Sequence, residues 1–84
     1  MEISCGYPVI DMIRTGENIT RLRKKCGYSI KALQEYCGLG SIQAVYKWQN
    51  GESLPMADNL LALSLAFGVS INEILVYSEV GHAA

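Results

Sequence analysis

The 84 residues of this chain are enough for one domain with a modest core and too few for two. Half of them are apolar and 18% are charged, a balance that excludes an intrinsically disordered chain. No apolar run is long enough to cross a bilayer, and the N-terminus lacks the layout of a secretory signal, so we expect a cytoplasmic protein.

The charges are distributed unevenly along the chain. The net charge of −1 argues, taken alone, against a nucleic-acid partner. All seven basic residues fall between positions 14 and 47, however, together with only two acidic residues, so this stretch carries +5 and the rest of the chain −6. A chain polarised in this way can present a positive face to phosphate. The alternative is that a basic run such as 21–25 is only the solvated face of a helix.

The three cysteines give little support to a metal site or a disulfide framework. Their number is odd, no C-x-x-C pair occurs, and only His82 could add a nitrogen ligand. We therefore expect no metal and no cofactor. Cys26 and Cys37 are interpreted as small buried apolar residues in a reducing compartment, whereas Cys5 could be exposed.

The first fifteen residues show no clear periodicity. Apolar residues are mixed there with Gly6 and Pro8, which predicts either an extended arm or an added turn before the first helix. Asp11 could cap an earlier start of that helix. The expected boundaries are an arm at 1–15, a domain at 16–77 and a flexible tail at 78–84.

Apolar spacing of three and four residues predicts five helices, so the expected fold class is all-α. Ser29 and Ser41 are expected to cap the second and third helices, and Ser70 with Glu73 fits the capping box of a short fifth one. The fourth helix is apolar around most of its surface and is expected to be the most buried. The first four helices are predicted at 16–26, 29–37, 41–50 and 57–67. Glycines that suit helix ends follow them, namely Gly27, Gly38, Gly51 and Gly68.

The second and third helices, joined by a glycine turn, have the layout of a helix-turn-helix. Such a pair must be short and closely joined, and its shared face must be apolar. The major groove of DNA admits one helix, while the other lies across its back and touches the phosphate chain.

Several short motifs follow one another in a recognisable order over about residues 16–76. They are Leu22-Arg23 before Gly27-Tyr28-Ser29, then Leu33 and Gly38, then Val45-x-x-Trp48-Gln49-Asn50-Gly51 with Pro55, and finally Leu60…Ala66-Phe67-Gly68-Val69-Ser70…Ile74-Leu75. In these motifs the sequence resembles the λ-repressor-like (Xre-type) helix-turn-helix regulators of phages and bacteria. The resemblance implies a five-helix fold and a sequence-specific double-stranded DNA-binding transcription regulator that acts as a repressor.

Three positions depart from the family pattern. Leu39-Gly40 precede Ser41, so the turn is expected to be one residue longer than usual, which leaves the docking depth of the third helix open. Ile30 stands where the family often has a glutamine that reaches a phosphate. Gln49 stands where the family commonly has glutamate.

The third helix is expected to read the DNA bases with its outward face. Val45 and Trp48 point inward, so core packing is favoured for Trp48 over stacking on single-stranded bases. By resemblance Ile42, Gln43 and Lys47 occupy base-reading positions; Gln43 could pair with adenine and Lys47 with guanine. Ile42 or Tyr46 could meet a thymine methyl group. The alternative for each is an exposed side chain without a contact or, for Lys47, a contact to phosphate alone.

Phosphate contacts are expected first at the N-termini of the two helices, from Ser29 and Ser41, where backbone N–H groups and the helix dipole attract anions. Simple capping is the alternative for both serines. Further candidates are Arg21, Arg23, Lys31 and Asn50.

A different function class stays open beside DNA binding. The acidic C-terminal half could bind a partner protein, as in an antitoxin or accessory module. An enzyme is not expected, because the chain has one histidine, no phosphate-binding glycine loop and no nucleophile beside a base. A palindromic operator would call for a homodimer, for which Ile74, Leu75, Val76 and Tyr77 are the expected surface; the alternative is a monomer that pairs only on DNA.

Overall fold

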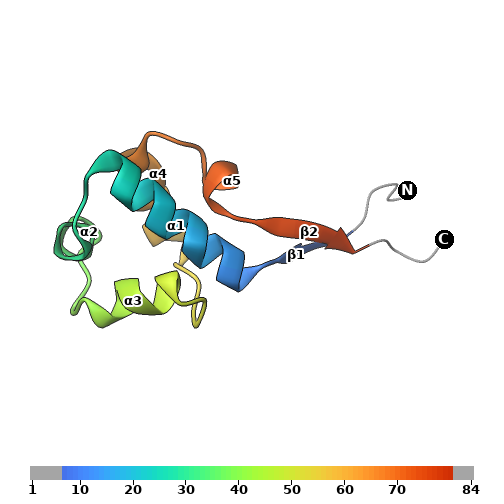
Figure 1. Ribbon diagram of the computed structural model, residues 1–84, viewed down its shortest axis with the longest axis horizontal. Helices are drawn as coiled ribbons and strands as arrows, with labels where there is room; N and C mark the ends of the chain where they lie inside the picture. The colour runs from blue at the N-terminus through green and yellow to red at the C-terminus, as the bar shows by residue number, and fades with distance from the viewer. Residues whose placement is uncertain (1–6, 81–84) are drawn as a thin grey trace.

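The computed structural model describes residues 7–80, which form five helices and one two-stranded sheet (Figure 1). The elements in chain order are β1 (Tyr7–Ile10), α1 (Met12–Cys26), α2 (Ile30–Tyr36), α3 (Gln43–Gln49), α4 (Ala57–Phe67), α5 (Ile71–Ile74) and β2 (Tyr77–Val80). The helices pack into one body, and the sheet projects from it (Figure 1). The expected five-helix fold is confirmed, with a small sheet added to it. The expectations for Cys5 and His82 lie outside the described residues.

The core is built from one or two apolar side chains of every helix. α1 runs through the middle of the body and contacts α3, α4 and α5. The buried apolar residues are Ile19, Leu22, Leu33, Val45, Trp48, Leu63, Phe67 and Ile74.

α4 is less buried than its composition predicts. Leu63 and Phe67 are buried, but the side chains of Leu61 and Leu65 are 53% and 68% exposed. The expectation that α4 is the most buried helix is therefore wrong. A helix packed along one side buries only one stripe, and the remaining apolar residues of α4 face water.

α1 begins earlier than its apolar spacing predicts. Asp11 is its N-cap, and the Asp11 carboxylate accepts a hydrogen bond from the backbone N–H of Arg14 at 2.9 Å. The cap that we considered for Asp11 is thus confirmed, and Gly16 lies inside the helix rather than at its start. A Cβ atom at Gly16 would meet the backbone carbonyl oxygens of Trp48 and Gln49, so only glycine lets α1 and α3 approach this closely.

All four helix-ending glycines have a positive φ, between +67° and +78°. Gly38 shows why this matters for the turn after α2. Its N–H donates to the Glu35 carbonyl at 3.1 Å, and the N–H of Leu39 donates to the Gln34 carbonyl at 2.9 Å. This left-handed end of the helix turns the chain back so that Leu39 packs against the core.

The capping box of α5 is present as predicted. Ser70 Oγ accepts from the Glu73 N–H at 3.3 Å, and the Ser70 N–H donates to the Glu73 carboxylate at 2.8 Å. The bonds from the backbone and the side chain of Ser70 lower the pKa of Glu73.

β1 and β2, the first and last elements described, pair antiparallel, with Tyr7 opposite Val80 and Ile10 opposite Tyr77. Of the two forms considered before the first helix, residues 7–10 adopt the extended one. Residues 78–80 belong to β2, so the expected flexible tail does not begin at residue 78. Thr15, a buried polar residue, ties the sheet to α1, because its Oγ1 accepts from the Val76 N–H at 2.9 Å.

The two described cysteines differ in environment. Cys37 is half-buried against the core, and its burial raises the pKa of the thiol. Cys26 is exposed, so the prediction that it is buried is wrong. It lies at the last position of α1, beyond the buried turn that contains Ile19 and Leu22. Within residues 7–80 no group of three or more potential ligands gathers as a metal site, and no helix is long and apolar enough to span a membrane.

Candidate nucleic-acid interface

α2 and α3 lie at the end of the body opposite the sheet (Figure 1). α2 begins as predicted at Ser29, whose Oγ accepts from the Ala32 N–H at 3.0 Å. α3 is capped one residue after the expected position. Its N-cap is Ile42, which makes no side-chain capping bond, so the prediction that Ser41 caps this helix is wrong.

The turn between α2 and α3 explains the late start of α3. Gln34 Nε2 donates to the Leu39 carbonyl at 2.6 Å, and this bond holds the chain in the turn after Gly38. Residues 37–42 therefore all lie between the two helices.

α3 separates its apolar and polar residues onto opposite faces. Val45 and Trp48 are buried in the core, which confirms their inward direction. Trp48 is therefore not available to stack on single-stranded bases. The four expected base-reading residues Ile42, Gln43, Tyr46 and Lys47 are all exposed, and so is Asn50. Their outward placement is confirmed, whereas their contacts to DNA stay a prediction.

Arg23 lies between α1 and α3 rather than on a free surface. Its Nε donates to Gln49 Oε1 at 2.9 Å, and a terminal nitrogen donates to the Tyr28 carbonyl at 2.8 Å. The side chain of Arg23 is half-buried, and its two bonds connect α1 to the segment before α2 and to α3. Arg23 thus acts as a positioning residue for α3, which the sequence does not reveal because Gln49 is far from it in the chain.

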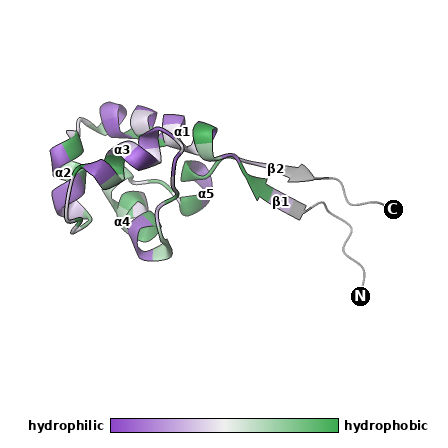
Figure 2. Ribbon diagram, turned by 90° about the horizontal axis from the view of Figure 1, so that it is seen from below, coloured by the Kyte–Doolittle hydropathy of each residue, from purple (hydrophilic) through white to green (hydrophobic). Residues whose placement is uncertain are grey.

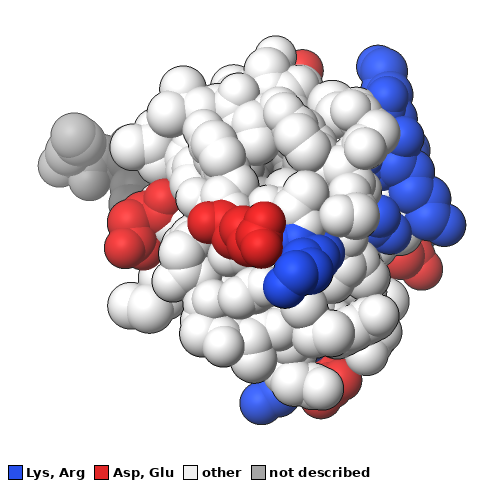
Figure 3. All heavy atoms as spheres, turned by 90° about the vertical axis from the view of Figure 1, so that its left-hand side faces the viewer, with Lys and Arg blue, Asp and Glu red and all other residues white. Residues whose placement is uncertain are grey.

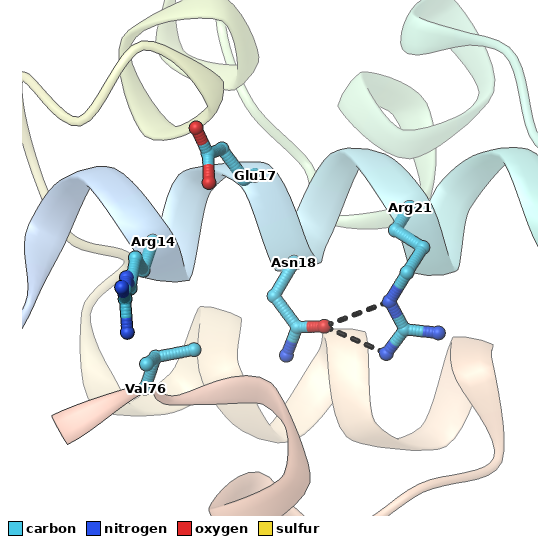
Figure 4. Close-up of a pocket in the computed structure, with 5 residues that line it drawn as sticks. All are labelled: Arg14, Glu17, Asn18, Arg21 and Val76. Atoms are coloured by element: carbon cyan, nitrogen blue, oxygen red, sulfur yellow. Dashed lines mark hydrogen bonds between the residues drawn. The ribbon is translucent and has the colours of Figure 1, made fainter.

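Arg21 points to a different side of α1. It lines a shallow pocket with Arg14, Glu17, Asn18 and Val76, and it donates twice to Asn18 Oδ1, at 2.7 and 3.2 Å (Figure 4).

The same asparagine ties this side of α1 to α5. Asn18 Nδ2 donates to the carbonyl oxygens of Glu73 and Ile74, whereas α1 meets α3 at Gly16 and Arg23. The fold therefore does not bring Arg21 together with the exposed residues of α3.

The basic residues do not gather in one patch. Figure 3 shows the end of the molecule formed by α2 and α3, where lysine and arginine atoms occur in separate groups with uncharged surface between them. Lys31 is exposed and lies 3.7 Å from the carboxylate of Glu35 one turn further along α2. Exposed pairs of this kind contribute little to stability and leave Lys31 able to exchange its partner for phosphate. The positive stretch of the sequence is spread over α1, α2 and α3.

One of the four residues expected at a dimer surface is inaccessible. Ile74 is fully buried in the core, so that part of the prediction is wrong. Leu75 and Val76 are half-buried, and Tyr77 is exposed in β2. Ile74 is the residue that the single turn of α5 contributes to the core cluster.

Comparison with known proteins agrees with this geometry. A family model described as helix-turn-helix matches residues 19–74. No curated protein matches the sequence. Among solved structures, the restriction-modification controller protein C.AhdI from Aeromonas hydrophila is 25% identical, with a TM-score of 0.68 over 76% of this chain and 96% of that one.

Two further structures resemble the chain. The P22 c2 repressor, solved with the synthetic operator 9T, is 38% identical, with a TM-score of 0.67 over 73% of this chain and 91% of that one. The DNA-binding domain of BldD is 20% identical and shows the fold alone, with a TM-score of 0.63 over 77% of this chain and 93% of that one. The family model covers most of the chain, including the two helices α2 and α3 and the glycine turn that joins them. This chain therefore belongs to the λ-repressor-like (Xre-type) helix-turn-helix family of DNA-binding transcription regulators.

Proposed function

We propose that this protein is a sequence-specific repressor that occupies an operator with α3 in the major groove of double-stranded DNA. The observation that carries the proposal is the outward face of α3, where Gln43, Tyr46 and Lys47 are exposed opposite the buried Val45 and Trp48. The P22 c2 repressor, 38% identical to this chain, was solved with a synthetic operator, which supports the same class of ligand here.

The base contacts follow from the chemistry of the exposed side chains. The amide of Gln43 can pair with adenine through one donor and one acceptor, and the ammonium of Lys47 suits the O6 and N7 atoms of guanine. Ile42 and Tyr46 offer apolar contact to a thymine methyl group.

Phosphate contacts are assigned to the exposed polar residues next to α2 and α3. They are Ser29, Lys31, Ser41 and Asn50. The Ser29 hydroxyl accepts from the Ala32 N–H and keeps its own proton for a phosphate oxygen. Arg21 and Arg23 are left out, because the first lies on another side of α1 and the second bonds to Gln49 and Tyr28.

The operator is proposed to be palindromic and bound by two copies of the chain. One copy presents about four side chains to the bases, a short sequence to recognise. Two copies related by a twofold axis would read half-sites about one helical turn apart, or about 34 Å.

Selection from a random duplex library tests binding, sequence preference and half-site spacing together. Affinity should fall steeply with salt, by a slope of about 0.9 in the logarithm for each phosphate contacted. Lys31→Gln should reduce this slope, while the matched charge removal Lys25→Gln at the end of α1 should change it much less. Absence of binding to any duplex at about 50 mM salt would sink the proposal.

A protein-interaction module is the second candidate, and one observation favours it. Met56, Leu61 and Leu65 expose large apolar side chains on and beside α4, in the acidic half of the chain. Large exposed apolar patches often mark protein contacts. This function would be supported if the chain bound no duplex DNA and Leu65→Lys abolished binding to a partner protein.

A further inference from the structure

The sheet extends beyond the helical body and leaves apolar side chains in water. Figures 1 and 2 both show β1 and β2 projecting away from the helices, with hydrophobic residues of β1 outside the body. The exposed fractions of Val9, Ile10 and Tyr77 are 45%, 38% and 51%. An isolated two-stranded sheet is marginally stable in water, so this one gains from a further strand.

The two edges of the sheet are not equivalent. The Asp11 N–H donates to the Val76 carbonyl at 2.8 Å, which continues the register of the two strands. Because hydrogen-bonded and non-hydrogen-bonded pairs alternate in an antiparallel ladder, the pair Val9–Ser78 is bonded. The pairs Ile10–Tyr77 and Pro8–Glu79 are not, so their backbone groups point outward.

Proline decides which edge can accept another strand. Pro8 has no N–H, so the outer edge of β1 lacks a donor in its middle. The outer edge of β2 presents the N–H and C=O of both Tyr77 and Glu79. Only the β2 edge offers a complete set of backbone donors and acceptors.

We propose that a second copy of this chain pairs with the β2 edge, so that two β2 strands run antiparallel about a twofold axis at Ser78. The result is a continuous four-stranded sheet in the order β1, β2, β2 of the second copy, β1 of the second copy. In this register Tyr77 lies opposite Glu79 of the second copy, which permits four backbone hydrogen bonds. A register that placed the two Glu79 residues opposite each other would oppose like charges.

The composition of the strands favours a second copy over a charged partner. β1 and β2 contain one acidic residue and no basic one, and natural sheets use charged residues, lysine above all, to prevent edge pairing. A strand paired with itself about a twofold axis makes a closed dimer and leaves the donor-poor β1 edges outside.

The inference rests on the proposed function only in that a palindromic operator needs two copies. Of the four residues expected at a dimer surface, the proposed strand edge keeps Tyr77 and leaves out Ile74, which is buried in the core. Dimerisation is measured without DNA, so the two proposals fail separately.

Sedimentation equilibrium over a concentration series tests the edge. The wild-type chain should dimerise, and Glu79→Pro, which removes one outward N–H from each copy, should raise the dimer dissociation constant about tenfold or more. The matched variant Ile10→Pro removes an outward N–H from β1 and should leave dimerisation nearly unchanged. A circular-dichroism melt of each variant shows that it is folded.

Cross-linking tests the register in a background with Cys5, Cys26 and Cys37 changed to serine. Ser78→Cys faces its own copy across the axis in a non-hydrogen-bonded pair, with a Cα separation of about 4.5 Å that suits a disulfide. Val9→Cys, directly across the ladder from Ser78, lies about 14 Å from its copy, three strand spacings away, and should not cross-link.

Three results would overturn the proposal. They are a wild-type chain that stays monomeric, equal cross-linking at Val9 and Ser78, and a dimer that survives Glu79→Pro but is dissociated by Leu65→Lys on α4. Duplex binding by a monomeric chain would leave the DNA-binding function intact and reject the sheet dimer. A sheet dimer that binds no duplex would support the strand pairing and reject the DNA-binding function.

Discussion

Two single residues set the position of α3 against α1. A side chain at Gly16 would collide with the backbone carbonyls of Trp48 and Gln49. Arg23, about two turns further along α1, donates a hydrogen bond to Gln49. Neither residue faces solvent as a DNA ligand would, yet both fix the helix that carries the base-reading residues.

Gly16→Ala should therefore destabilise the fold although alanine favours helix formation. The added methyl group would force α1 and α3 apart, at a cost of about 1–3 kcal/mol or more in the free energy of unfolding. Urea denaturation measures this loss. Gly40→Ala is the control, because a Cβ atom there meets nothing within 4 Å and its φ is not positive. Equal stability of the two variants would contradict the close contact at Gly16.

Lys47→Ala separates base recognition from phosphate binding. If Lys47 reads a base, the substitution costs about 1–3 kcal/mol of binding free energy and relaxes the preference at one operator position. Competition binding with operator variants at fixed salt measures both effects. A uniform loss on every sequence would show that Lys47 contacts phosphate alone. Folding should be unaffected, since the side chain is exposed.

The N-termini of α2 and α3 differ in whether a side chain caps them. Ser29 caps α2 through its hydroxyl, whereas α3 begins at Ile42 without a side-chain cap. Ser29→Ala should lower the free energy of unfolding by about 1 kcal/mol, and Ser41→Ala should change it by less than about 0.5 kcal/mol. Thermal melts followed by circular dichroism measure both. A large loss at Ser41 would contradict the observed start of α3.

The junction between α1 and α3 offers a stabilising substitution. The side-chain amide of Gln49 is an uncharged acceptor for a charged, half-buried donor, Arg23. Gln49→Glu would place a full negative charge there and should add about 1 kcal/mol at neutral pH. Gln49→Ala should destabilise, because the Arg23 donor loses its partner. The order Glu above Gln above Ala in denaturation midpoint is expected, and any other order would reject this account of Arg23.

At the scale of the whole molecule, Thr15 connects the sheet to the helical body. Its Oγ1 accepts from the Val76 N–H at 2.9 Å, just before β2. Thr15→Val keeps the volume but leaves that partly buried N–H unpaired, at a cost of about 1–3 kcal/mol. Amide hydrogen exchange of Val76 should accelerate in step with the stability loss. Thr20→Val removes only a bond to Gly16 within α1 and should have little effect.

The helical elements and the direction of the residues on α3 could be predicted without the structure. Glycines at the helix ends, the Ser70–Glu73 capping box and the inward pair Val45 and Trp48 are local signals, set within one or two turns of helix. These signals also carry the family resemblance, so fold and DNA-binding class could both be predicted from them.

What each helix face contacts depends on packing between distant segments and could not be predicted in the same way. The late start of α3, the role of Arg23 and the burial of Ile74 all follow from contacts between segments distant in the chain. The sheet is the clearest case, since β1 and β2 come from opposite ends of the sequence and are too short to show a pattern. Periodicity reveals which side of an element is apolar, whereas packing alone selects its partner. The edge that β2 leaves open is visible for the same reason only once the two strands are paired.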